Sequence, residues 1–213
     1  DWLKDTIIVF TSDHGDYLGD HWLGEKDLFH NASVRIPLII YDPSEEANDS
    51  RGTIVEDLVE AIDVCPTILE AVGADPVMER LEGDSLLPLI RNGGDSFTSR
   101  EAAISEINYS SRGPRLRLRL NPSDCRGYMV QTNEWKYIFY RNFPPQLFDL
   151  QDDPNEIVDR GTDVRYDAVR KRFHDHLFDW MGSLKVRTEV SFSDTYHSTP
   201  QSTAESGIMI GHW

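Results

Sequence analysis

The segment from Thr6 to Phe29, "TIIVFTSDHGDYLGDHWLGEKDLF", holds the strongest chemical pattern in the chain. It opens with a β-branched and aromatic run, which predicts a strand buried in a parallel sheet. Asp13 and His14 come just after this strand, where open α/β folds place their ligands. Gly15 then lets the backbone turn sharply. The pattern fits two structures, an ordinary surface turn or one wall of a binding site.

As a binding site, this turn has the chemistry to hold a metal ion. Asp13 offers a hard oxygen and His14 a borderline nitrogen, so together they can fill two positions around a divalent cation. Lys26 carries a point charge on a long stem, which suits an anionic group held by that metal.

Four further polar or aromatic residues of this region are candidates for a substrate pocket: Asp20, His21, Trp22 and His30. Asp20 and His21 form the rim of a pocket in one interpretation and a hydrogen-bonded loop pair in the other. Trp22 either lines a leaving-group pocket or packs beneath the loop, as most aromatic side chains do.

The charge of the chain excludes several classes of partner. Among 213 residues, 37 are acidic and 21 basic, giving a net charge of −16. Such a field repels nucleic acid and anionic membranes, so we expect neither as a partner. A small anionic substrate would need local cations or a metal to reverse the potential. No apolar stretch reaches membrane-spanning length.

The two cysteines, Cys65 and Cys125, are too few and too far apart for a secreted disulfide framework. With no recognisable signal peptide, they favour a cytoplasmic location, although the chain starts as if in mid-domain and its N-terminus is uninformative. We expect Cys65 to pack in the core against the sheet.

Changes in pattern along the chain predict three parts. Residues 1–100 form an α/β unit, residues 101–182 a smaller antiparallel sheet with a helix, and residues 183–213 an extended tail. Strands are expected at 6–10, 37–41 and 102–107 and in the segments "GYMVQT", "KYIFY" and "QLFDL". Helices are expected within 56–72 and at 163–182, and the basic segment "RGPRLRLRL" reads as a loop or edge strand.

Beyond these patterns, the chain resembles the sulfatase and alkaline phosphatase superfamily. "TIIVFTSDHGDYLGDHWLGEKDLFHNASVRIPLIIYDP" resembles the segment that supplies the second half of that family's metal site. "IDVCPTILEAVGADPVMERLEGDSLLPLI" and "EWKYIFY…PPQLFDLQDDPNEIVD" resemble its later motifs. The resemblance implies the C-terminal part of an alkaline-phosphatase-like α/β/α sandwich, followed by a smaller antiparallel α+β subdomain.

The resemblance also implies roles for individual residues. Asp13 and His14 become ligands of one divalent metal ion, Mn²⁺ or Ca²⁺, while Lys26 acts with His14 in catalysis by contacting the sulfuryl or phosphoryl oxygens. The family's nucleophile is a formylglycine made from a "(C/S)-x-P-x-R" motif, which this chain does not contain. Cys65 lacks both that spacing and the arginine, so we expect the formylglycine upstream of this chain.

The implied function is a metal-dependent hydrolase of sulfate esters or of phosphonate or phosphate esters. Its partners would be a small anionic ester and the N-terminal half of the same protein. The ending "GIMIGHW" resembles tails that join phosphonate monoester hydrolase subunits, which implies a homo-oligomer. The alternative is a catalytically incomplete fragment that binds a metal or anion or serves in assembly.

Overall fold

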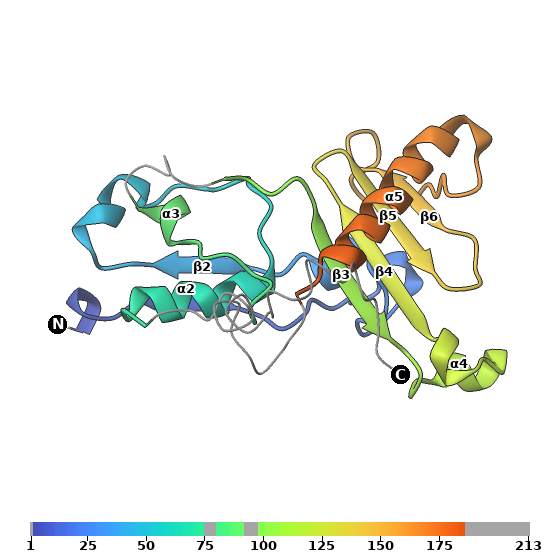
Figure 1. The fold of residues 1–213 in the computed structure, drawn as a ribbon, viewed down its shortest axis with the longest axis horizontal. Coiled ribbons are helices and arrows are strands. Elements are labelled where there is room, and N and C mark those ends of the chain that lie inside the picture. The colour runs from blue at the N-terminus through green and yellow to red at the C-terminus, as the bar shows by residue number, and fades with distance from the viewer. Residues whose placement is uncertain (1, 75–79, 92–97, 186–213) are drawn as a thin grey trace, which may run out of the picture.

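The computed structural model describes residues 2–74, 80–91 and 98–185. A two-stranded sheet with helix α2 lies at one end, and a four-stranded sheet with helix α5 lies at the other (Figure 1). Within the described ranges, no helix combines the length and apolar character needed to cross a bilayer. The strands are β1 (Ile8–Thr11), β2 (Leu38–Tyr41), β3 (Ala103–Asn108), β4 (Arg126–Gln131), β5 (Trp135–Tyr140) and β6 (Gln146–Asp149). The α-helices are α1 (Asn31–Val34), α2 (Val64–Ala71), α3 (Leu87–Ile90), α4 (Gly113–Leu118) and α5 (Asp167–Ser183).

The smaller sheet corrects the expectation of a buried parallel strand at residues 6–10. β1 pairs with β2 in antiparallel register, because the chain reverses direction in the long loop that carries the candidate site. Phe10 stands opposite Ile39, and these side chains are 59% and 63% exposed. An apolar strand face therefore lies open within the part of the chain that the structure describes.

The larger sheet is buried on both faces, because successive apolar side chains along its strands point to opposite faces of the sheet. Its strands run in the order β3-β4-β5-β6, all antiparallel, which confirms the predicted meander. Val130, Tyr137 and Leu147 form one core with Phe173 and Leu177 of α5. Their sequence neighbours Met129, Ile138 and Phe148 form a second core on the opposite face, closed by Phe29.

Helix α5 forms where the sequence predicts it, and it crosses one face of the four-stranded sheet (Figure 1). Its buried residues, Phe173 and Leu177, are four positions apart and therefore share one helical face. The predicted tail 183–213 lies outside the described residues beyond Lys185.

Two further expectations are wrong. The segment "RGPRLRLRL" contains helix α4 in place of a loop or edge strand. Pro114 in the first turn favours a helix, and so does the helical propensity of the Arg and Leu residues. These preferences outweigh the period-two alternation of Arg and Leu, which is typical of a strand. Cys65 is exposed, whereas Pro66 and Thr67 are buried. Helical spacing turns Asp63, Pro66 and Thr67 inward and leaves Cys65 on the opposite side of α2.

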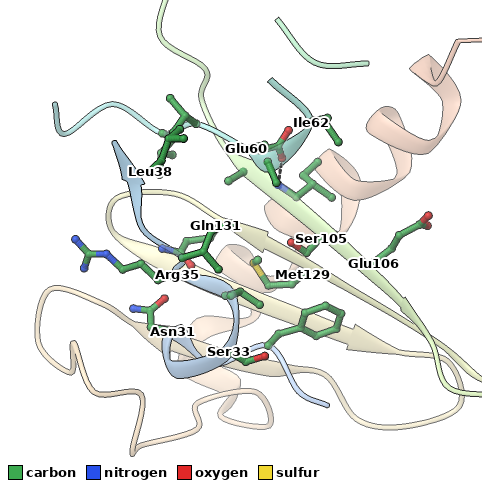
Figure 2. Close-up of a pocket in the computed structure, with 18 of the residues that line it drawn as sticks. Asn31, Ser33, Arg35, Leu38, Glu60, Ile62, Ser105, Glu106, Met129 and Gln131 are labelled. Atoms are coloured by element: carbon green, nitrogen blue, oxygen red, sulfur yellow. Dashed lines mark hydrogen bonds between the residues drawn. The ribbon is translucent and has the colours of Figure 1, made fainter. Parts of the chain in front are cut away.

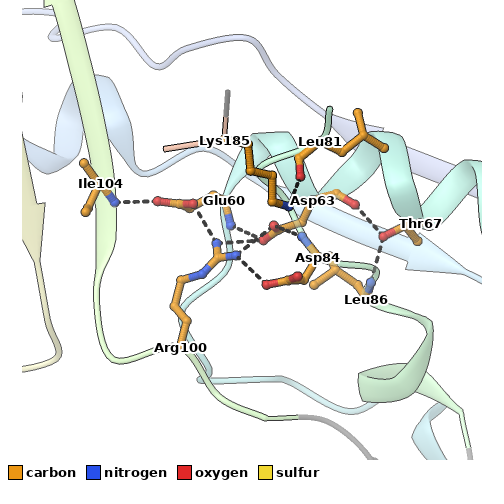
Figure 3. Close-up of polar contacts among 9 residues, drawn as sticks. All are labelled: Glu60, Asp63, Thr67, Leu81, Asp84, Leu86, Arg100, Ile104 and Lys185. Atoms are coloured by element: carbon orange, nitrogen blue, oxygen red, sulfur yellow. Dashed lines mark hydrogen bonds and ion pairs between the residues drawn. The ribbon is translucent and has the colours of Figure 1, made fainter. Parts of the chain in front are cut away.

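A buried ion-pair cluster joins α2 to the start of β3 (Figure 3). Arg100 donates two parallel hydrogen bonds of 2.9 Å to Asp63 and pairs with Glu60 at 2.9 Å. Asp63 is only 1% exposed, and it also accepts hydrogen bonds from the backbone N–H groups of Glu60 and Asp84. The motif residues Asp63 and Thr67 are therefore structural: Thr67 accepts a 2.8 Å hydrogen bond from the Leu86 N–H.

Candidate active site

The candidate site lies at the end of β1, in a cleft of about 1350 Å³. Asp13, His14 and Lys26 all line this cleft. Figure 2 shows Asn31, Ser33 and Arg35 of the 31–38 segment and Glu106 of β3 among the residues that line it. The three residues singled out in the sequence are therefore brought together on one wall.

His14 is oriented by its own backbone neighbourhood. Its Nδ1 lies 2.7 Å from the Gly15 carbonyl oxygen, so Nδ1 is the protonated nitrogen and Nε2 keeps its lone pair. Nε2 lies 3.5 Å from the Asp13 carboxylate and accepts a hydrogen bond from the Lys26 ammonium. The two potential ligand atoms therefore lie side by side, and the Lys26 ammonium contacts one of them, the His14 Nε2.

Helix α1 fixes both ends of this arrangement. The Gly15 N–H donates to the Ser33 carbonyl at 2.7 Å, and the Ser33 hydroxyl donates to the Lys26 carbonyl at 2.7 Å. A Cβ atom at residue 15 would lie 2.1 Å from the Ala32 carbonyl oxygen. Only glycine permits this approach, so Gly15 is required for packing as well as for the turn.

The predicted substrate-pocket residues Asp20, His21, Trp22 and His30 do not line this cleft. Trp22 is 93% exposed, so it does not pack beneath the loop. His21 and Trp22 have φ values of 53° and 56°, which are strained for residues with a side chain. Their loop therefore adopts a conformation that the surrounding chain must hold.

His30 is buried and belongs to an aromatic cluster. Its Nδ1 lies 2.8 Å from the Tyr17 hydroxyl, and its ring stacks on His21 with centroids 4.0 Å apart. Burial, together with the nearby His21, lowers the pKa of His30 to about 4. Burial also raises the pKa of Tyr17 to about 12. A neutral His30 thus holds the loop together from within.

Lys136 and Glu156 stand in the segment that resembles the family's last motif but were assigned no role from the sequence, and they lie directly beneath the site loop. Their side chains form an ion pair and are 0% and 2% exposed. The Lys136 ammonium also donates to the Phe29 carbonyl at 2.9 Å and to the Asn31 side-chain oxygen at 2.8 Å. The available signal was a lysine in an otherwise apolar strand, because a buried lysine needs a partner.

The donor set fits part of a metal site. An imidazole that donates its other N–H to a backbone carbonyl is the usual arrangement of a metal-binding histidine. The Asp13 side chain is 86% exposed and free to coordinate. The described residues contain no group of three or more His, Cys, Asp or Glu side chains placed to hold a metal ion. Asp13 and His14 would therefore supply two ligands of a larger set.

Comparison with known proteins identifies the family. The model of the C-terminal region of N-sulphoglucosamine sulphohydrolase matches residues 19–182. The chain belongs to this sulfatase family. Membership confirms the expected C-terminal portion of a sulfatase and alkaline phosphatase superfamily protein.

Individual sulfatase-family relatives match along most of the chain. The multifunctional alkaline phosphatase superfamily protein PehA of Trinickia caryophylli is 35% identical over 92% of this chain and 37% of its own length. Human arylsulfatase K is 34% identical over 89% of the chain and 34% of its own length. The chain therefore spans about a third of the length of these relatives.

A solved structure supports the same family and the expected fold class. The phosphonate monoester hydrolase of Agrobacterium radiobacter superposes with a TM-score of 0.76 at 31% identity. The match covers 84% of this chain and 35% of that protein. Its fold is that of the sulfatase and alkaline phosphatase group, which confirms the predicted mixed helix-and-sheet class.

Proposed function

We propose that this chain is the C-terminal part of a hydrolase that acts on sulfate esters or on phosphonate or phosphate esters. The observation that carries the proposal is the convergence of Asp13, His14 and Lys26 on one cleft wall in a chain of the sulfatase family. Relatives named as arylsulfatases and as phosphonate monoester hydrolases support both substrate classes.

Each residue has a distinct role in this function. Asp13 and His14 would hold one divalent cation, and the hydrogen bond from His14 Nδ1 to the Gly15 carbonyl would leave the Nε2 lone pair for it. Lys26 contacts the oxygens of the sulfuryl or phosphoryl group, where its charge is most useful as negative charge builds up. Because Nε2 has one lone pair, the Lys26 ammonium would give up its hydrogen bond to His14 when a cation binds there, and it would then be free to donate to the substrate oxygen.

The activity of this chain by itself depends on the metal and the nucleophile. A bound Mn²⁺ or Ca²⁺ would act as a Lewis acid on the ester oxygens, and a formylglycine supplied upstream would provide the attacking oxygen. Because the chain has neither the nucleophile motif nor a full ligand set among its described residues, we infer that it is inactive without the N-terminal half.

The organisation of the protein follows the same proposal. Residues 1–100 belong to the C-terminal half of the sulfatase-like α/β domain, residues 101–182 form the antiparallel subdomain, and residues 183–213, which lie outside the described residues beyond Lys185, serve in a homo-oligomer. Asp20, His21 and Trp22 act at the rim from the strained loop, while His30 supports that loop from beneath.

The test is a catalytic assay of the full-length protein on an aryl sulfate, an aryl phosphonate monoester and a phosphate diester, with and without Mn²⁺. We expect turnover of at least one ester and its loss in Asp13→Ala. Gly24→Ala is a suitable control, because no atom lies within 4 Å of a Cβ added there. Metal-independent turnover, or an active Asp13→Ala variant, would favour the alternative, a binding or assembly fragment.

A further inference from the structure

The candidate site and the four-stranded sheet are joined by polar contacts that cross between distant parts of the chain. Lys136 is on β5 and Glu156 follows β6, whereas Phe29 and Asn31 lie in the site loop. The Lys136 ammonium donates hydrogen bonds to the Phe29 carbonyl and the Asn31 side-chain oxygen. The Glu156 carboxylate accepts a hydrogen bond from the Asn31 backbone N–H at 2.6 Å. The ion pair thus binds one end of α1 from two directions.

These contacts continue from α1 to the site without a break. Three residues after Phe29, the Ala32 carbonyl packs against Gly15, and the neighbouring Ser33 carbonyl accepts the Gly15 N–H. The Ser33 hydroxyl in turn holds the Lys26 carbonyl. A shift of α1 would therefore move both the turn that carries His14 and the backbone of Lys26.

We propose that Lys136 and Glu156 are positioning residues that set the geometry of the metal and anion site through α1. Neither residue is among those that line the cleft, so they act through Asn31 and Ser33 without touching substrate. This inference rests on the proposed function for the identity of the ligands, but the mechanical connection stands on the contacts alone.

A simpler explanation is that the pair only stabilises the fold. Burial disfavours both charges, and a buried ion pair is weak evidence for stability, since apolar residues of similar volume often serve as well. The pair's particular partners argue for positioning. Its remaining hydrogen-bonding capacity is directed at Phe29 and Asn31, the two residues at the start of α1.

The test measures Mn²⁺ affinity by calorimetry and peptide hydrogen exchange in the full-length protein. The variants are Asn31→Ala, which removes one hydrogen bond, and the double variant Lys136→Met/Glu156→Gln, which leaves no lone buried charge. We expect Mn²⁺ binding to weaken by about 10- to 100-fold, as for residues that orient metal ligands. Exchange in peptides covering residues 12–17 and 26–34 should also accelerate without metal.

Arg91→Met is the matched control, because it breaks the buried Asp42–Arg91 pair, 2.6 Å apart, away from α1. It should lower stability and leave both readouts unchanged. The proposal is overturned if folded Asn31→Ala and the double variant match the wild type, or if Arg91→Met alters both readouts equally. A wild type that binds neither Mn²⁺ nor Ca²⁺, with exchange still accelerated in the variants, would support positioning and refute the proposed function.

Discussion

The Nε2 atom of His14 accepts a hydrogen bond from the Lys26 ammonium while lying 3.5 Å from the Asp13 carboxylate. The turn after β1 thus places one candidate ligand nitrogen beside one candidate ligand oxygen, and the nitrogen already contacts a cationic side chain. Lys26 then lies within reach of any anion bound there.

Replacing Lys26 should separate catalysis from metal binding. Lys26→Ala removes a charge that would act on the transferred group, so we expect kcat to fall by about 10²- to 10³-fold. Metal stoichiometry should stay at the wild-type value, because Asp13 and His14 are intact. Steady-state kinetics and metal analysis of the full-length protein check this. Lys171→Ala, on the exposed side of α5, is the matched control and should change neither quantity.

Gly15→Ala should destabilise the protein through a backbone clash. The added Cβ would meet the Ala32 carbonyl oxygen, and neither backbone segment can move without breaking the Gly15–Ser33 hydrogen bond. Overpacking of this kind costs about 1–3 kcal/mol in the free energy of unfolding. Denaturant unfolding measures it. Gly24→Ala has open space around its Cβ and should be neutral; equal losses in both variants would refute the argument.

The ion-pair cluster around Arg100 should contribute strongly to stability. Arg100→Met leaves Asp63 buried without its two hydrogen bonds from the guanidinium, and such losses cost about 3–5 kcal/mol. Thermal unfolding should show a large decrease in Tm. Arg165→Met breaks an ion pair with Asp163 at the surface and should leave Tm almost unchanged. Similar Tm values for both variants would mean that the cluster is not important.

Stability should depend on pH through His30. Its pKa is about 4 when folded and about 6.5 when unfolded, so the unfolded chain binds more protons between these values. His30 therefore contributes stability that is complete above pH 6.5 and is lost as the pH falls toward 4, by roughly 3 kcal/mol in all. Unfolding measured across this range should show a shallower slope for His30→Gln.

The control for this pH effect is His174→Gln, which changes an exposed histidine of α5. Carboxyl groups also titrate below pH 5. The informative quantity is therefore the difference in the slope of stability against pH between each variant and the wild type. A wild-type slope in His30→Gln, or a flattened slope in His174→Gln, would assign the effect to other residues.

The sequence predicted most of the larger sheet and helix α5. The strand patterns coincide with a sheet that is buried on both faces, and the helical spacing of apolar residues coincides with the buried face of α5. It failed for β1, whose apolar residues suggested burial, although Phe10 is exposed among the described residues. It failed again for α4, where alternating Arg and Leu residues imitate a strand while their helical propensity decides.

For the site, the sequence predicted which residues lie together better than it predicted what supports them. Asp13, His14 and Lys26 do meet in one cleft, since a strand end and a turn fix their positions locally. His30 is buried away from the cleft, and Lys136 supports the site from more than 100 residues along the chain. The sequence shows only a lysine in an apolar strand there, and its partners so far away in the chain leave no local pattern.

The most direct measurement is the metal content of the full-length protein, determined after dialysis for the wild type, Asp13→Ala and His14→Ala. If Asp13 and His14 ligate one divalent cation, the wild type should retain one Mn²⁺ or Ca²⁺ per chain and each variant should lose it while remaining folded. A wild type that retains no metal, or folded variants that keep a full equivalent, would contradict the assignment of this cleft as a metal-dependent ester hydrolase site.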